Sequence, residues 1–392
     1  VMRLVGSEMC IRDRAGPATD FEFPDFDEGT RATTFYTTGT TGEPKAVAYS
    51  HRQLVLHTMG LLAGFGPIET SNRLHRGDVY MPITPMFHVH AWGFPYAATL
   101  LGIKQVYAGR YTPANLLRLI AEEGATFSHC VPTILQMLLS APEAADTDLS
   151  RLKMLIGGSA LPRGLAESAL AQGINVYTGY GLSETCPVLT FAVLDPDDEA
   201  DVEARLKTGN PLPLVDLQTV GAGMAELPRD GASTGEVVVR APWLNAEYVK
   251  NPEATEALWE GDYLHTGDVG HIDASGALMI TDRMKDVIKS GGEWVSSLEL
   301  ESLVSAVDGV AEVAAIGVQD DKWGERPVLL IVAREGAEED AIKGGISAAA
   351  QQAVAAGNLS KWAVPDQFRF VAEIAKTSVG KIDKKRLRAE FE

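Results

Sequence analysis

Runs of apolar residues alternate with helical patterns over the first half of the chain. The runs predict buried strands at residues 33–36, 125–131, 152–156 and 174–178. Apolar positions at helical spacing predict helices at residues 51–62, 113–124, 132–140 and 162–172. Ser50 is a good cap for the first helix, and Pro113 and Gly124 suit the two ends of the second. Strands that alternate with helices of this length predict an α/β fold with a largely parallel sheet.

The pattern changes after residue 183. Residues 195–203 form an acidic run, most simply a solvated loop, and residues 214–220 and 235–240 indicate a β-rich subdomain. An apolar strand at 278–281 is followed by the short charged segment 282–286 (DRMKD). About a hundred residues remain, enough for a small α+β domain. Its predicted strands and helix lie at residues 310–318, 327–333, 341–355 (the helix) and 367–371.

Composition and charge narrow the classes of ligand. The chain has 392 residues, 45% of them hydrophobic, which is enough for a large core. Its 53 acidic and 34 basic residues give a net charge of −19, which disfavours binding of nucleic acid through the general field. An anionic ligand therefore needs a local basic patch. The densest patch could also be a solvated terminal helix; it contains Lys376, Lys381, Lys384, Lys385, Arg386 and Arg388.

The cysteines and the apolar runs indicate a cytoplasmic protein. Cys10, Cys130 and Cys186 are far apart and lack metal-ligand spacing, which is typical of a reducing compartment. No apolar run reaches transmembrane length, although peripheral membrane contact stays open. Residues 1–14 show no helical or strand period and resemble translated sequencing-adapter read-through. We therefore exclude residues 1–17 from the predicted fold as artefact or disorder.

Five segments carry candidate chemistry. In residues 36–45 (YTTGTTGEPK), small residues let the backbone close around phosphate oxygens and Lys45 adds charge. The spacing from Gly42 to Lys45, followed by Ala46, excludes a Walker loop, and a simple polar turn is the alternative. In residues 177–185, Tyr180 can stack on a base, Glu184 can hold Mg²⁺ and Thr185 can bind a phosphate.

The other three segments are weaker signals when each is taken alone. Asp268, in a TGD tripeptide, suits contact with ribose hydroxyls. Residues 282–292 (DRMKDVIKSGG) and 376–381 (KTSVGK) place lysines on glycine-containing loops. Such a lysine can reach a phosphoryl group and neutralise charge that develops there.

In this order the five segments resemble the adenylate-forming (AMP-binding) superfamily. The closest resemblance is to bacterial medium- and long-chain fatty-acyl-CoA synthetases, and it rests on residues 85–93, 157–160, 289–297 and 323–327. The resemblance implies an ATP-dependent fatty-acid:CoA ligase. Such an enzyme forms an acyl-adenylate with release of pyrophosphate, then an acyl-CoA with release of AMP. ATP, Mg²⁺ and coenzyme A are the implied cofactor and co-substrates.

The resemblance assigns roles residue by residue. The residues expected at the ATP phosphates are Thr37, Thr38, Gly39, Thr40, Thr41, Gly42 and Lys45. Those expected around adenine, Mg²⁺, the α-phosphate and the ribose are, in order, Gly158, Ser159 and Tyr180; Glu184; Thr185; and Asp268 and Arg283. Lys381 is expected to contact the substrate carboxylate and the α-phosphate, and its charge would stabilise the transition state.

The same resemblance predicts a moving domain and an acyl tunnel. The hinge falls on Lys285, which divides a large domain (18–284) from a small mobile domain (285–392). After rotation, a loop with Lys289, Gly291 and Gly292 would line the path of the CoA thiol. His88 would lie near the carboxylate and Trp92 would gate the tunnel, although both could be ordinary core residues. Trp92 favours medium or long acyl chains over acetate or aryl acids.

The chain also departs from the family pattern. Ala46 stands where glycine is usual, and a methyl group would be strained there if the backbone needs a positive φ. Ala375 replaces a frequent proline. The family carries a long stretch before the phosphate loop, so we expect the chain to be an N-terminally truncated fragment, with homodimerisation a property of the full-length protein.

Two other functions remain open at this point. The first is an adenylating enzyme that loads a separate acyl carrier protein. The second is an inactive nucleotide-binding fragment. A requirement for CoA or for a carrier in AMP release would decide the first case, and ATP binding without adenylate formation would indicate the second.

Overall fold

Parallel strands form the centre of the N-terminal part of the chain. The computed structural model describes residues 22, 24–37, 44–291, 293–357, 359–377 and 381–390. Within these residues, seven strands form one sheet in the order β4-β3-β5-β6-β7-β8-β9. Strands β4 to β7 of this order pair in parallel and β8 and β9 pair antiparallel, so the predicted α/β class is confirmed. Their bounds are β3 Val79–Pro82, β4 Lys104–Gln105, β5 Phe127–Cys130, β6 Lys153–Ile156, β7 Asn175–Gly181, β8 Val188–Phe191 and β9 Asn210–Pro211.

Helices bury both faces of this sheet. Because strand side chains alternate between faces, Tyr80 and Leu155 pack on the side of α2 and α4, and Met81 and Ile156 pack on the side of α5, α6 and α7. The helix bounds are α2 His51–Phe65, α3 Val89–Trp92, α4 Phe94–Leu101, α5 Pro113–Glu123, α6 Pro132–Leu139 and α7 Arg163–Ala171. Ser50 caps α2 in a capping box with Gln53, and Gly124 ends α5 in the left-handed conformation, as the sequence predicts.

A β-rich subdomain follows, as expected. Its five described strands pair antiparallel in the order β10-β11-β13-β12, with β14 on the other side of β13. The bounds are β10 Asp216–Val220, β11 Gly235–Arg240, β12 Trp259–Glu260, β13 Tyr263–Ile272 and β14 Leu278–Arg283, with the short helices α8 Val202–Leu206 and α9 Pro252–Glu256 nearby. A separate hairpin, β1 Arg31–Tyr36 and β2 Ala46–Ser50, carries the predicted phosphate loop at its turn.

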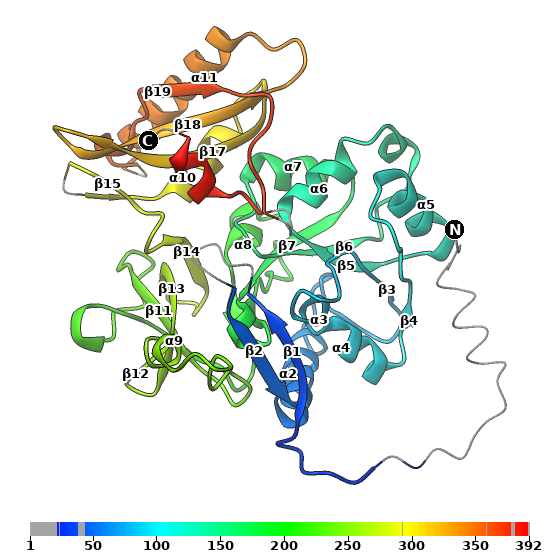
Figure 1. The fold of residues 1–392 in the computed structure, drawn as a ribbon. Helices are drawn as coiled ribbons and strands as arrows, with labels where there is room; N and C mark the ends of the chain where they lie inside the picture. The colour runs from blue at the N-terminus through cyan, green and yellow to red at the C-terminus, as the bar shows by residue number, and fades with distance from the viewer. Residues whose placement is uncertain are drawn as a thin grey trace.

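The C-terminal part has a second core around its own sheet. Figure 1 shows it in yellow to red at one end of the N-terminal part. Its described strands are ordered β16-β15-β18-β17, with β19 parallel to β18. The bounds are β15 Ile288–Ser290, β16 Glu293–Val295, β17 Val310–Asp320, β18 Gly324–Ala333, β19 Gln367–Phe370, α10 Ser297–Ser305, α11 Glu339–Ala355 and α12 Lys384–Ala389. The large and small α/β units of the expected architecture are thus present.

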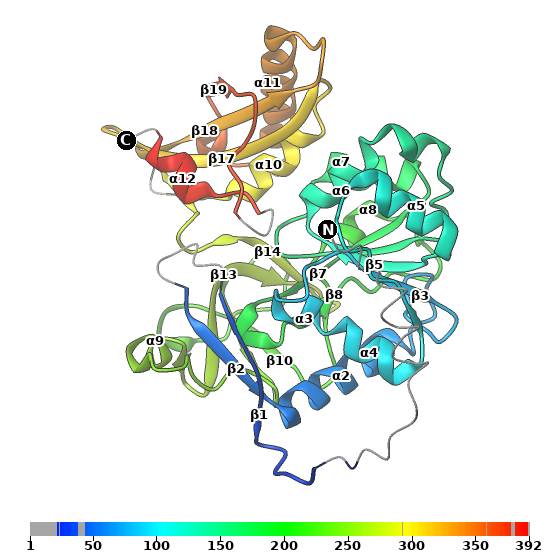
Figure 2. The same ribbon diagram turned by 45° about the vertical axis from the view of Figure 1, so that its right-hand side comes forward.

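The two parts touch at two places. Figure 2 shows α10 beside α7, where a Cβ on Gly164 would lie 2.6 Å from the carbonyl oxygen of Ser305. At the end of β14, the Asp282 carboxylate accepts hydrogen bonds from the Ser297 amide (2.6 Å) and hydroxyl (2.8 Å). Strand β14 extends through Arg283, so the expected hinge residue Lys285 lies in the turn that follows it. The hinge and the domain boundary remain predictions.

Membrane spans were sought in the same residues. None of the described helices combines the length and the apolar character that a bilayer crossing requires.

Candidate active site

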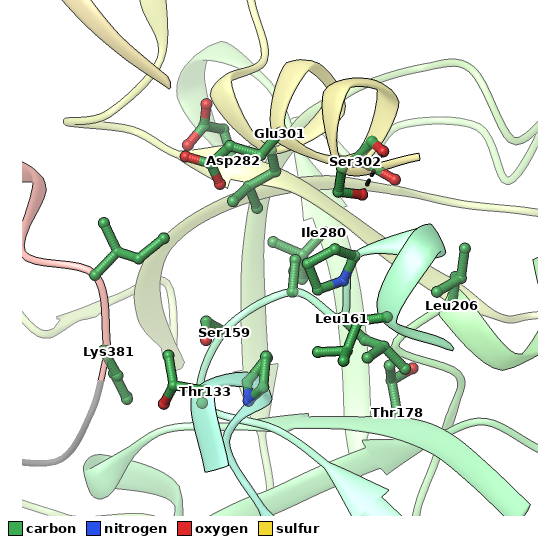
Figure 3. Close-up of a pocket in the computed structure, with 18 of the residues that line it drawn as sticks. Thr133, Ser159, Leu161, Thr178, Leu206, Ile280, Asp282, Glu301, Ser302 and Lys381 are labelled. Carbon is green, nitrogen blue, oxygen red and sulfur yellow. Dashed lines mark hydrogen bonds between the residues drawn. The ribbon is translucent and has the colours of Figure 1, made fainter. Parts of the chain in front are cut away.

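A cleft of about 1360 Å³ lies between the N-terminal and C-terminal parts. On the N-terminal side, residues that directly follow β5, β6 and β7 line it, which is where open α/β sheets place ligands. Figure 3 shows Ser159 and Thr133 on one side of the cleft, Asp282 and Glu301 opposite, and Lys381 entering from the side. The predicted site residues that line the cleft are Thr37, Lys45, His88, Gly158, Ser159, Tyr180, Glu184, Asp268, Arg283, Lys285 and Lys381.

Tyr180, Asp268 and Arg283 form one connected group. Asp268 and Arg283 are paired residues of β13 and β14, and the Arg283 Nε lies 3.2 Å from the Asp268 carboxylate. The Tyr180 hydroxyl, on β7, donates a 2.8 Å hydrogen bond to the same carboxylate. Burial raises the pKa of Asp268, and Arg283 opposes this rise. The carboxylate keeps free lone pairs that can accept hydrogen bonds from ligand hydroxyls.

Lys381 brings a cation into the cleft from the C-terminal part. Its segment is held by a bridge between Lys376 and Ile382 and by a 2.8 Å bond from the Thr377 amide to the Lys381 carbonyl. Its Cε lies 3.1 Å from the place that a Cβ on Gly158 would occupy, and Gly158 has a φ of +78°. Glycine therefore suits that position twice, through its conformation and through the space it leaves.

The surroundings of Lys381 weaken its hold on the proton. Burial is the largest cause and Arg283 the next, and together they lower the pKa of Lys381 to about 8. The carboxylates of Asp268 and Glu184 oppose this shift. The ammonium group is therefore partly desolvated, and an anion in the cleft would interact with it strongly.

Glu184, Tyr248 and Lys45 line the end of the cleft near the β1–β2 hairpin. The Tyr248 hydroxyl donates a 2.6 Å hydrogen bond to the Glu184 carboxylate, and the Lys45 ammonium lies 4.7 Å from the centre of the Tyr248 ring. Nothing in the sequence pattern pointed to Tyr248, because its contacts come from distant segments. One carboxylate beside a phosphate pocket fits Mg²⁺, which is usually held by one or two carboxylates together with substrate phosphates.

The base of the expected phosphate loop is closed by its own backbone. The Lys45 amide donates to the Thr37 hydroxyl (3.0 Å) and the Thr37 amide donates to the Lys45 carbonyl (2.9 Å). The remaining predicted loop residues, which lie outside the described residues, are Thr38, Gly39, Thr40, Thr41 and Gly42. Ala46 begins β2 opposite Tyr36 and has no positive φ, so its methyl group is not strained there.

The structure corrects the expectation for Thr185. Its side chain is fully buried behind the strand end, and its hydroxyl accepts from the Leu182 amide (2.9 Å) and donates to the Pro187 carbonyl. Thr185 is thus committed to the local turn and does not line the cleft. Ser183 lines it instead, and no described residue bonds the Ser183 hydroxyl. The alternation of side chains along this segment was the signal that could have distinguished the two.

His88 and Trp92 lie at a small side cavity of about 40 Å³ that shares Gly158, Tyr180 and Lys381 with the cleft. Burial, with a smaller contribution from Lys381, lowers the pKa of His88 to about 4. His88 is therefore neutral at physiological pH. Trp92 is 5% exposed and stacks on His129 with ring centres 4.8 Å apart. This position is compatible with the predicted role at an acyl pocket.

An unusual backbone presents these two side chains. Residues Val89, His90, Ala91 and Trp92 have φ values of 46°, 55°, 48° and 60°, and Gly93 follows with 78°. The segment is thus a left-handed turn, which side chains other than glycine rarely adopt. The expected right-handed helical reading of a helix assignment here would be wrong.

The expected CoA loop lies away from the cleft. Lys289 is in β15, where its amide donates a 2.8 Å hydrogen bond to Glu325, and Gly291 packs against Trp362. Neither residue lines the cleft, and Gly292 lies outside the described residues. The structure therefore brings Lys381 to the site and leaves this loop outside it.

Comparisons with known proteins agree with this arrangement. The model of the AMP-binding enzyme family matches residues 6–249, and that of the AMP-binding enzyme C-terminal domain matches residues 299–381. A long-chain-fatty-acid–CoA ligase of Thermus thermophilus is 40% identical over 91% of this chain and 65% of its own length. A 3-methylmercaptopropionyl-CoA ligase of Ruegeria lacuscaerulensis is 37% identical over 95% of this chain and 68% of its own length.

A solved structure extends the match to the fold. The ATP-bound MatB of Rhodopseudomonas palustris superposes with a TM-score of 0.79 at 27% identity, covering 97% of this chain and 72% of the other. The chain thus spans about two thirds of the length of the curated relatives, 65% and 68% in the two cases above.

Proposed function

The chain belongs to the AMP-binding enzyme family, and from this premise we propose that it is a fatty-acid:CoA ligase. It activates the acid with ATP as an acyl-adenylate and then transfers the acyl group to coenzyme A. The observation that carries the proposal is the entry of Lys381 into a cleft whose opposite wall holds Asp268 and Glu184. The Thermus relative, a long-chain-fatty-acid–CoA ligase, supports the choice of substrate class.

The nucleotide lies along the ends of the parallel strands. Asp268 accepts the ribose hydroxyls while Tyr180 and Arg283 hold its carboxylate in place. The backbone at Gly158 and Ser159 forms the second wall of the adenine pocket. Lys45 and the segment that follows Thr37 are placed to meet the β- and γ-phosphates.

Lys381 acts on the first half-reaction through its charge. A carboxylate oxygen of the acid attacks the α-phosphorus, the bond to the bridging oxygen breaks, and pyrophosphate leaves. No proton transfer is needed, so the requirement is to screen two anions that approach each other. A partly desolvated ammonium group does this better than one in water, because the effective dielectric constant of the cleft is lower. Ser183 is a further donor for an oxygen of this group.

Glu184 is the residue that would hold Mg²⁺, with Tyr248 fixing its carboxylate. When bound, the ion supplies charge neutralisation on the phosphate oxygens. Glu184 is also close enough to Lys381 to influence its pKa, so the site alternates cationic and anionic groups.

The second half-reaction requires a different arrangement. The CoA sulfur attacks the acyl carbonyl carbon and AMP leaves, and the thiol must approach where Lys381 now lies. A rotation of the C-terminal part about Lys285 would withdraw Lys381 and bring in the Lys289–Gly291 segment. The contacts of Asp282 with Ser297 would break in such a rotation, because they join residues on either side of the hinge.

The test is formation of acyl-CoA from ATP, Mg²⁺, CoA and a series of acids from acetate to palmitate, followed by mass spectrometry. Lys381→Ala should lower the rate of adenylate formation by about a hundredfold or more, since it removes a group that stabilises transition-state charge. The rate with preformed acyl-adenylate should change far less.

Lys376→Ala is the matched control. Lys376 lies on the same segment but pairs with Glu312 at the surface, 3.0 Å away, and does not line the cleft. Equal losses in both variants would assign the effect to the segment and not to the Lys381 charge. Absence of any adenylate with every acid, from a folded chain that binds ATP, would overturn the proposed reaction.

A further inference from the structure

The side cavity next to Lys381 has a closed end. It opens from the cleft between His88 and Gly158, and it is bounded by Leu155, Val188 and Trp92. A carboxylate that contacts Lys381 would direct its alkyl chain into this space, because the opposite direction is occupied by the nucleotide residues. The length of the cavity therefore bears directly on the length of the acid.

Trp92 fills the inner end and has little room to move. Its ring lies against Gly157, where an added Cβ would come within 3.1 Å of the indole. Its opposite face stacks on His129 at 4.8 Å with an interplanar angle of 30°. Its backbone belongs to the left-handed turn, so its side-chain direction is set by an already restrained conformation.

His129 is itself fixed on both ring nitrogens. The Tyr80 hydroxyl lies 2.7 Å from Nε2, and the Thr84 hydroxyl lies 3.0 Å from Nδ1. Thr84 also donates to the His129 carbonyl (3.3 Å), so its hydroxyl must accept from the ring. The ring is then neutral, with its proton on Nδ1 and with Nε2 accepting from Tyr80. This agrees with the effect of burial, which lowers the pKa of His129 to about 3.

The space behind His129 is also filled. Phe94 stacks on its ring at 5.1 Å, and Phe94 in turn packs against Phe127 at the same distance. All three side chains are at most 1% exposed. If the indole of Trp92 is to swing inward and lengthen the cavity, His129 must move, and His129 cannot move without breaking two buried hydrogen bonds.

We propose that His129 is a specificity-determining residue that backs Trp92 and limits the substrate to acids of about three to five carbons. The cavity measures about 40 Å³, whereas a cavity of about 150 Å³ accommodates one benzene molecule, so about two carbon atoms fit beyond the carboxylate region. The inference rests on the proposed reaction and corrects the expectation, drawn from Trp92 alone, of medium or long chains.

Binding of adenylate analogues measures the limit without turnover. The probes are 5′-O-(N-acylsulfamoyl)adenosines with acetyl, butanoyl, hexanoyl, octanoyl and decanoyl groups, titrated calorimetrically into the chain. The butanoyl compound should bind best, and the octanoyl compound at least about tenfold more weakly, since a blocked alkyl chain cannot enter the cavity. Equal or tighter binding of the octanoyl and decanoyl compounds overturns the inference.

Two His129 variants separate space from hydrogen bonding. His129→Ala opens room behind Trp92 and should raise the ratio of octanoyl to butanoyl affinity by about tenfold or more. His129→Phe keeps a stacked ring but loses both hydrogen bonds, so it should retain the butanoyl preference. An unchanged ratio in folded His129→Ala shows that His129 does not set the limit. If His129→Ala does not fold, Trp92→Gly, which removes the indole and suits a positive φ, should produce the same shift, and no shift there overturns the inference.

The two proposals fail in different ways. If neither the acetyl nor any longer compound binds, the adenylate site is absent and the proposed reaction fails with the inference. If the short compounds bind and the long compounds bind as well, only the limit set by His129 fails. Matching acyl-CoA yields with butanoate and octanoate in the wild-type chain would support the second outcome.

Discussion

At the residue scale, Lys381 is the group whose chemistry is most altered by its surroundings. It is buried in the cleft near Arg283 and Lys285, two other cations, and these with burial lower its pKa to about 8. A lysine in water would stay protonated to about pH 10. Because only the protonated form can screen the carboxylate and the phosphate, the proton of Lys381 becomes relevant near physiological pH.

The rate of adenylate formation should therefore depend on pH. In the free enzyme Lys381 is charged below about pH 8 and neutral above it. The kcat/KM for ATP–pyrophosphate exchange, measured without CoA, should be flat below this pH and fall as the pH rises through it. Lys381→Arg should be slower but should not show the fall, since arginine keeps its proton throughout the range. The same fall in Lys381→Arg would assign it to another group.

Single residues were predictable where the backbone around them is local. Asp268, Arg283, Tyr180 and Glu184 all line the cleft as the motifs predict. Thr185 was placed on the wrong side, because its burial depends on the turn that follows β7. Tyr248 and His129 carry no local signal at all. Their roles come from contacts with Glu184 and with Tyr80 and Thr84, which are far away in the sequence.

At the scale of elements, the left-handed turn at residues 89–93 departs most from sequence expectation. Each residue with a side chain costs about 1–2 kcal/mol in this conformation. The turn is held by its burial, since Val89, Ala91 and Trp92 are at most 5% exposed. Strain of this kind concentrates at functional sites, and here it presents His88 and Trp92 to the cavity beside Lys381.

A pair of alanines can measure this strain. Ala91 in the turn and Ala97 in α4 are both fully buried, but only Ala91 has a positive φ. Ala97→Gly should lower the free energy of unfolding by about 2 kcal/mol, through lost helix propensity and a lost buried methyl group. Ala91→Gly should lower it by less than about 1 kcal/mol, because relief of strain offsets the same losses. Urea denaturation checks both values, and equal losses would mean that the turn is not strained.

The regular elements were predictable to the extent that each has its own hydrophobic period. The strands and helices of the parallel sheet, the Ser50 cap and the Gly124 stop agree with the sequence analysis. Strands β2, β13 and β16 were not found. Residues 263–272 contain His, Thr, Gly and Asp, which are poor strand signals, and β13 forms because β11, β12 and β14 pair with it.

At the scale of the whole molecule, the arrangement of the two parts decides which half-reaction the site can perform. Lys381 reaches the cleft only while the C-terminal part packs on α7. That packing depends on a glycine, since a Cβ at Gly164 would lie 2.6 Å from the Ser305 carbonyl oxygen. The obstructing atom belongs to the backbone, so it cannot turn away as a flexible side chain would. Sequence patterns within either part do not reveal this contact.

Gly164→Ala should therefore separate docking from stability. Gly164 has ordinary helical geometry in the first turn of α7, where alanine favours the helix by about 1 kcal/mol. The free energy of unfolding of the N-terminal part should not fall. Adenylate formation should fall by about tenfold or more, because displacement of the C-terminal part by about 1 Å misplaces Lys381. Thioester formation from preformed acyl-adenylate should be unaffected or faster, since it requires the C-terminal part to leave this position.

A second helical glycine provides the matched comparison. Gly344 lies in α11 of the C-terminal part, and a Cβ there would meet no atom within 4 Å. Gly344→Ala should raise the free energy of unfolding by about 1 kcal/mol and leave both half-reactions unchanged. A selective loss of adenylate formation in Gly164→Ala alone would tie that half-reaction to the docked arrangement. Equal loss of both half-reactions in Gly164→Ala would instead indicate damage to the shared nucleotide site, and would contradict the assignment of this arrangement to the first half-reaction.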